Sequence, residues 1–326
     1  MRSADQRFHW EVHKDLCIPT KRARTKFSKE EISIRNDPGD GGFILPARVF
    51  EEHAGHFWGI IGTRNYMMRR FDFVNTMLES FPSHLVALQT AVDHIMDMMR
   101  LNRSDNMGLR ELVPALMLRL GRDQDAYDFV RWWATCSLDE DYDWGDMALP
   151  HLDTRGADLL EEPKWWTGSV RELSHASVVV LIKLRVLLTL RDLQNTPRAL
   201  QNSRLPREIV DQVRCELLAD SLLAGRRGLA SADTPKLAAM IERVRNQILA
   251  LYVAVDAANT EFWLLLLGAA SHADENLVLG KPAAYSIGSV EEAELIASYN
   301  FMAWEETPGA VDELGVIWAR YNMDKP

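Results

Sequence analysis

The sequence predicts an all-α protein in which antiparallel helix pairs stack into an array. Eight segments carry apolar residues at steps of three and four, the spacing that gives a helix one apolar face. We find no convincing alternating strand of useful length, and the β-branched run at 178–180 begins a stretch too long for a typical strand. The predicted helical segments are 65–79, 85–101, 109–120, 123–135, 175–194, 207–223, 235–259 and 290–304.

Helix ends within these segments support the prediction. Pro235 stands in a first helical turn, where its missing N–H costs nothing, and Gly121 directly after Leu120 is a plausible helix stop. The connection at Gly121 is about two residues long, which brings the flanking helices into antiparallel contact. The Leu120-Gly121 pair followed by Ala126 resembles the helix–turn–helix of tetratricopeptide repeats, and Ala91 lies close to one repeat period before Ala126. We therefore expect a tetratricopeptide-like array.

Composition and charge restrict the function classes. The chain has 326 residues, of which 47% are hydrophobic, and its formal net charge is −10. Such a charge argues against a general nucleic-acid coat, since phosphate binding requires dense Lys and Arg. Three cysteines far apart are too few for a disulfide framework and fit a reducing compartment. We expect an intracellular protein, in the cytoplasm or the nucleus, of unknown oligomeric state.

No segment is expected to enter a membrane. The N-terminal residues are mixed polar and lack the apolar centre of a secretory signal. The two most apolar stretches, 176–190 and 248–270, are interrupted by charged residues, and neither offers about 20 apolar residues in a row. Both are predicted to be buried helices.

The charge is distributed asymmetrically, and this suggests the domain organisation. Residues 1–35 hold nine Lys or Arg and five Asp or Glu, so this basic N-terminal segment is followed by a strongly acidic remainder. A turn-rich stretch with Pro and several glycines predicts a linker at 36–45, followed by a helical repeat-like domain at 46–326. The basic run at 21–26 is typical of a solvated flexible segment, and its alternatives are a nuclear import signal or a nucleic-acid contact.

The N-terminal segment resembles the last part of a MYND-type zinc finger, a protein-interaction module. His13 and Cys17 have the H-x3-C spacing of that family's final two ligands, and His9-Trp10 precede them as they do in the family. The upstream cysteines that the resemblance implies are absent, and zinc requires about four ligands. We expect a truncated finger without a cofactor, in which His13 and Cys17 bind zinc only if further ligands complete the site.

The wider sequence is similar to a group of fungal MYND-finger proteins with a long helical C-terminal region. The segments that carry this likeness are 42–50, 56–61, 105–108 and 142–145. The resemblance implies a partner-binding or regulatory protein more than an enzyme.

An acidic loop at 139–146 is the sequence candidate for partner contact. Its exposed carboxylates would suit a basic peptide, with two aromatic residues as anchors. A calcium loop is excluded because its template needs Gly at position 6 and Glu at position 12, where this chain has Trp144 and Pro150. The alternatives are a solvated loop whose aromatic residues pack inward, and an adventitious cation site. The candidate residues are Asp139, Asp141, Tyr142, Asp143 and Trp144.

Sequence motifs of common enzymes are absent: there is no nucleophile elbow, phosphate-binding loop or zinc-protease motif. We expect a scaffold or adaptor that binds a peptide or helix of a protein partner. The alternative is an enzyme of unrecognised type with a pocket inside the helical array. A third hypothesis is a nuclear regulator that uses the run at 21–26, although nucleic acid is a less favoured partner.

Overall fold

The computed structural model describes residues 4–39, 44–136, 139, 141–168, 170–200, 205–271, 280–282 and 284–323. Within these ranges every regular element is a helix, and the predicted all-α class is confirmed. The tetratricopeptide-like arrangement of the helices stays a prediction.

The chain divides into two compact units. The first unit comprises Met1–Leu116 and Asp141–His151, and the second comprises Met117–Glu140 and Leu152–Pro326. The segment 36–45, which the sequence suggests as a linker between domains, connects helices of the first unit. From Asp141 onward the acidic loop belongs to this first unit, whereas its residue Asp139 belongs to the second.

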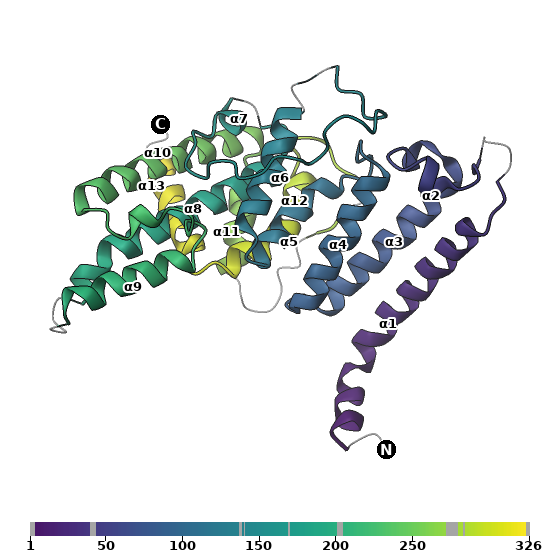
Figure 1. The fold of residues 1–326 in the computed structure, drawn as a ribbon, viewed down its shortest axis with the longest axis horizontal. Helices are drawn as coiled ribbons and strands as arrows, with labels where there is room; N and C mark the ends of the chain where they lie inside the picture. Colours follow the sequence, from purple (N-terminus) through teal and green to yellow (C-terminus); the bar gives the residue numbers. More distant parts are fainter. Residues whose placement is uncertain are drawn as a thin grey trace. The chain divides into compact units, whose positions relative to one another are not determined.

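The first unit is organised around three long helices that lie side by side, with α3 contacting both α1 and α4 (Figure 1). Short helices cover the ends of these three. The elements are α1 (Ala4–Arg35), α2 (Val49–Glu52), η1 (Phe57–Gly59), α3 (Ile61–Ser80), α4 (Leu85–Leu101) and η2 (Leu109–Glu111), with α5 (Val113–Arg119) beginning in this unit.

Apolar stripes explain the packing of these helices. The observed bounds of α4 are those predicted, and its buried residues Leu88, Val92, Ile95 and Met99 recur at steps of three and four. Helix α1 is mostly polar and has few buried apolar side chains, among them Phe27 and Ile34, seven residues apart. Because two helical turns separate such positions, both fall on the face of α1 that meets α3.

The second unit surrounds one apolar helix, α8. This helix contacts α6, α9, α10, α12 and α13. It is long and apolar enough to cross a membrane, but 83% of its most apolar 18-residue window is buried inside the protein, as in the core helix of a soluble fold. Helices α10 and α11 pass the same test only as a pair, and they are bent by 110°. The elements are α6 (Asp123–Cys136), α7 (Lys164–Thr167), α8 (Leu173–Ala199), α9 (Arg207–Ala219), η4 (Arg227–Leu229), α10 (Thr234–Ala258), α11 (Phe262–Ser271), α12 (Val290–Glu305) and α13 (Ala310–Met323).

Two predicted helix ends are confirmed. Gly121 has a φ of 70° between α5 and α6, a conformation that glycine adopts without strain. Helix α10 begins at Thr234 with Pro235 in its first turn, and the Asp233 side chain accepts a hydrogen bond from the Lys236 N–H at 2.9 Å.

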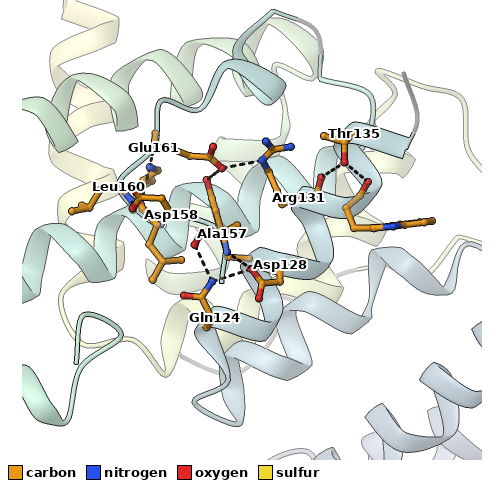
Figure 2. A network of polar contacts seen from close by, with 12 residues as sticks. Gln124, Asp128, Arg131, Thr135, Ala157, Asp158, Leu160 and Glu161 are labelled. Carbon is orange, nitrogen blue, oxygen red and sulfur yellow. Dashed lines mark hydrogen bonds and ion pairs between the residues drawn. The ribbon is translucent and has the colours of Figure 1, made fainter. Parts of the chain in front are cut away.

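A connection without regular structure, residues 156–162, is held by side chains of α6 (Figure 2). The buried carboxylate of Asp128 accepts hydrogen bonds from the N–H groups of Gly156 and Ala157, both at 2.8 Å. Gln124 donates to the same carboxylate and to the Ala157 carbonyl. The side chains thus bind main-chain groups that a helix would otherwise pair internally.

Further along this connection, Glu161 accepts hydrogen bonds from Tyr127 and Arg131, each at 2.9 Å (Figure 2). Lys183 of α8 is fully buried and donates from Nζ to the carbonyls of Leu159 and Glu161 at 2.8 and 2.6 Å. Burial lowers the pKa of Lys183 to about 8, because the charged ammonium loses water that these carbonyls only partly replace.

This pKa predicts how stability depends on alkaline pH. The unfolded chain binds a proton at Lys183 up to its ordinary pKa of 10.5, whereas the folded chain releases it near 8. The contribution of Lys183 to the free energy of unfolding is therefore lowest below pH 8 and rises by up to about 3 kcal/mol towards pH 10.5. Urea unfolding of the wild type and Lys183→Met at both pH values measures the difference. Equal pH dependence of the two proteins would contradict the prediction.

Candidate partner-binding site

The acidic loop has an exposed carboxylate face. Asp139, Asp141 and Asp143 are exposed, whereas Tyr142 and Trp144 are half-buried. The two rings meet edge to face, with their centroids 4.7 Å apart. The loop thus combines exposed carboxylates with partly covered aromatic rings.

A buried arginine holds this loop in place. Arg103 is only 2% exposed, and its guanidinium donates to the carbonyls of Asp146 at 2.6 Å and Leu149 at 2.8 Å. It also donates to the Tyr142 hydroxyl at 2.7 Å, and that hydroxyl donates in turn to the Pro150 carbonyl at 2.6 Å. Tyr142 is therefore part of the internal support of the loop. Binding of a partner by the five loop residues stays a prediction.

The predicted zinc ligands lie in α1. The side chain of His13 is outside the part of the structure that is described, and Cys17 is half-buried with a free thiol. Among the described residues, no group of three or more His, Cys, Asp or Glu side chains is arranged to hold a metal ion.

A groove between α1 and α4, which we call the α1–α4 groove, is the strongest candidate site. Its volume is about 830 Å³, and α3 forms its base. The residues of α1 that line it follow one helical stripe at steps of three and four. The lining residues are Cys17, Thr20, Lys21, Arg24, Phe27, Ser28 and Glu31 from α1, Phe73, Met77 and Phe81 from α3 and its end, and His84, Val86, Ala87, Thr90 and His94 from the start and body of α4.

The floor of the α1–α4 groove is aromatic. The rings of Phe27 and Phe73 stack with centroids 6.1 Å apart and planes 6° from parallel. The His94 ring stands edge-on to both, at 5.6 Å from Phe27 and 5.3 Å from Phe73. Val86 at the margin is 68% exposed, so apolar surface continues from the floor to the rim.

A charged network beneath the floor fixes the orientation of His94. Arg70 of α3 is 7% exposed and donates from Nε to His94 Nδ1 at 3.0 Å. The same guanidinium pairs with Asp97 at 2.6 Å and donates to the Tyr66 hydroxyl at 3.0 Å. Burial, and secondly the positive charge of Arg70, lower the pKa of His94, so this imidazole is neutral at pH 7.

The rim of the groove on α1 is basic. Lys21 and Arg24 are exposed, and neither forms an ion pair with a residue that the structure describes. The acidic lining residue Glu31 is paired with Arg35 at 2.9 Å. The groove therefore offers two available positive charges above an apolar floor.

Grooves of the second unit are different in charge. One of about 530 Å³ contains Arg191 paired with Glu313, and Arg245 within 3.7 Å of Glu242. Arg320 also lines this groove, so it carries charges of both signs, in contrast to the rim formed by Lys21 and Arg24. The buried Lys183 and Asp128 are likewise bound to main-chain groups, which gives them a structural role.

Sequence reasoning missed the α1–α4 groove because its α1 stripe is polar. The basic run at 21–26, which the sequence suggests is flexible, lies within helix α1. Helical geometry places Lys21 and Arg24 on the groove side, while Arg22 and Lys26 of the same run do not line it. The excess of positive charge in residues 1–35 was the available signal.

Comparison of the chain with protein-family models, curated proteins and solved structures gives no match.

The Arg103 contacts predict a stability effect. Arg103→Met leaves the carbonyls of Asp146 and Leu149 without their donor, and we expect a loss of about 2–4 kcal/mol in the free energy of unfolding. Limited proteolysis should also cut the loop 141–151 faster. The control is Arg155→Met, which removes an exposed arginine that also donates to main-chain carbonyls and should change stability by less than about 0.5 kcal/mol. Equal effects of the two variants would contradict the assignment.

The lowered pKa of His94 predicts a loss of stability in acid. Burial opposes its protonation most strongly and Arg70 of α3 next, Asp97 and Asp93 of α4 favour it, and Arg24 of α1 opposes it with the smallest effect. The unfolded chain takes up this proton near pH 6.5 and the folded chain only at lower pH, so the contribution of His94 is present above pH 6.5 and is lost as pH falls. Between about pH 7.5 and 5.5, the midpoint temperature of thermal unfolding should fall more steeply for the wild type than for His94→Asn. Parallel declines would show that the assignment is wrong.

Proposed function

We propose that this protein is a protein-interaction adaptor that binds an acidic amphipathic helix of a partner in the α1–α4 groove. The observation that carries this proposal is the combination of an apolar floor with a basic rim, whose Lys21 and Arg24 form no ion pair with any residue that the structure describes. Each part of the groove matches one feature of such a helix.

The apolar floor would accept the apolar face of a helix. Phe27, Phe73 and Met77 line the floor with only 5 to 7% of each residue exposed, and Val86, which is 68% exposed, supplies apolar surface at the margin. A furrow between two helices that pack on a third accommodates another helix by the same ridge-into-groove packing that joins helices within a domain. The lining residues of α1 run from Cys17 to Glu31, so the furrow extends for about 21 Å, or nearly four helical turns.

The basic rim selects the charge of the partner. Lys21 and Arg24 stand on the groove side of α1, where the flank of a bound helix would lie. Acidic side chains on that flank would gain opposite charges, whereas basic ones would be repelled. The two charges stay hydrated until a partner binds, so their main effects are on the association rate and on the choice of partner.

The acidic loop is a second candidate surface of the same adaptor. Its exposed Asp139, Asp141 and Asp143 suit a basic segment. Because Tyr142 supports the loop internally, its replacement would disturb the fold together with any binding. Asp139→Asn with Asp141→Asn tests this surface while Tyr142 is retained.

An enzyme is less well supported. Convergent buried ionisable groups around a cavity would favour catalysis, but Arg103, Asp128 and Lys183 bind main-chain groups. In the α1–α4 groove Lys21 and Arg24 are exposed and Glu31 is paired with Arg35.

A display selection tests the proposal directly. The full chain is immobilised and challenged with a library of helical peptides of about 18 residues, or five turns, randomised in charge around a fixed apolar stripe. Groove-specific peptides are those that bind the wild type and not Thr90→Trp, which fills the groove from α4 without a change of charge. We expect them to be enriched in Asp and Glu. Selection of neutral or basic peptides, or of none, would reject the proposed occupant.

The charge-reversal variant also gives a quantitative prediction. Lys21→Glu/Arg24→Glu should weaken a selected peptide by at least about 10-fold in fluorescence anisotropy, since two attractive charges become repulsive. The matched control is Arg22→Glu/Lys26→Glu, which makes the same charge change on the same helix away from the groove. The control should stay within about 3-fold of the wild type. If both variants weaken binding equally, net charge rather than the groove controls it.

A further inference from the structure

The floor of the α1–α4 groove adds a hydrogen-bond donor to the proposed binding site. The role assigned to this donor rests on the proposed function. We infer that His94 is a specificity-determining residue of the α1–α4 groove, whose Nε2–H donates a hydrogen bond to one carboxylate of the bound acidic helix. Three observations lead to this assignment: the tautomer of His94, the free state of its Nε2, and the apolar surface around it.

The contact with Arg70 determines the tautomer. A guanidinium has donors only, so the 3.0 Å contact between Arg70 Nε and His94 Nδ1 requires Nδ1 to be the acceptor. A neutral imidazole with an accepting Nδ1 carries its proton on Nε2. Arg70 is held in turn by Asp97 and the Tyr66 hydroxyl, so the donor state of His94 is fixed from below.

The Nε2 atom has no partner in the part of the chain that is described. The hydrogen bonds of His94 there involve Nδ1 alone, and Nε2 is not among the buried atoms that lack a partner. It is therefore accessible to solvent. Since His94 lines the α1–α4 groove, a molecule that fills the groove would cover this N–H and must supply an acceptor.

Because of the surroundings of His94, the affinity of a bound molecule depends on whether it supplies this acceptor. Phe27 and Phe73 contact the imidazole edge-on, so covering the site removes water from the N–H and leaves an apolar environment. A buried donor without an acceptor is costly, whereas a hydrogen bond to a charged acceptor is about twice as strong as a neutral one. Arg24 is close enough to act on the charge state of His94, and its charge also favours a carboxylate over an amide at this place.

His94 in the floor and the basic residues of the rim would then recognise different features of one bound helix. Lys21 and Arg24 respond to the overall charge of its flank, in exposed positions where interactions are weak and screened by salt. His94 responds to a single carboxylate at a fixed position, because its ring packs edge-on with Phe27 and Phe73 and its Nδ1 is bound to Arg70. This predicts a ligand motif with one indispensable Glu or Asp among several replaceable ones.

Two substitutions of His94 distinguish hydrogen bonding to the ligand from a structural role. His94→Asn places an amide oxygen near the position of Nδ1, where it can still accept from Arg70, but it has no donor that reaches the groove. His94→Gln places an amide N–H near the position of Nε2 and loses the acceptor for Arg70. We expect His94→Asn to weaken a selected acidic peptide by about 10- to 100-fold and His94→Gln to retain most of the affinity. His84→Asn, a histidine at the exposed margin of the same groove, is the matched control and should bind as the wild type does.

A double-mutant cycle identifies the acceptor. Each Glu of the peptide is replaced by Gln in turn, and every peptide is measured against the wild type and His94→Asn. At one position, replacement of Glu by Gln should weaken binding of the peptide to the wild type. The same replacement should not weaken its binding to His94→Asn. In ¹⁵N-histidine spectra of the full chain, the signal that is missing from His94→Asn should show protonated Nε2 and unprotonated Nδ1, and its Nε2–H should shift when the peptide is added.

The outcomes distinguish the two proposals. If no acidic peptide is selected, the proposed occupant of the groove is wrong. The same holds if palmitate, which combines a carboxylate with an apolar chain, displaces the selected peptides and binds more tightly. If an acidic peptide binds and depends on Lys21 and Arg24, but no Glu couples to His94, the adaptor function stands and the role of His94 is wrong. A loss of binding in His94→Gln as large as in His94→Asn would also overturn it, because the ring would then act through Arg70 and packing alone.

Discussion

The packing of Phe27 of α1 against α3 is the interaction on which the candidate site depends. Helix α1 is polar along most of its length, so this ring supplies much of its apolar anchor, with Phe73 stacked on it and Tyr66 at 5.7 Å. Because α1 and α4 both dock on α3, the space between them remains as a groove. Without the anchor, α1 would have little reason to stay at this distance from α4.

Arg70 connects this anchor to the chemistry of the floor. Its guanidinium lies 5.7 Å from the Phe27 ring and is bound to Tyr66, His94 and Asp97. A buried arginine is costly unless its donors are satisfied, and the partners that satisfy it come from both α3 and α4. One set of contacts therefore holds the two helices together and fixes the hydrogen-bonding state of the imidazole.

In both units, buried polar side chains stabilise connections that lack regular structure. Arg103 binds carbonyls of the loop 141–151, and Asp128 and Lys183 bind the main chain of 156–162. Asp128 and Lys183 are ionisable residues among apolar positions of the sequence, a pattern that also occurs at functional sites. Their contacts show a structural role, which leaves the α1–α4 groove as the place where polar groups face outward over apolar surface.

The sequence by itself determined the helical class and most helix bounds, because apolar residues at steps of three and four, together with Gly121 and Pro235, are local signals. The ends of α4 and the start of α6 agree with prediction for this reason. Helices α1 and α13 were not predicted as helices. Most of the stabilising contacts of α1 come from α3, not from its own pattern, and its first part was interpreted as the remnant of a finger. The groove could not be predicted either, since it joins Lys21, Phe73 and His94 from three helices. Only tertiary packing brought these residues together, and only the contact with Arg70 decided which nitrogen of His94 carries the proton.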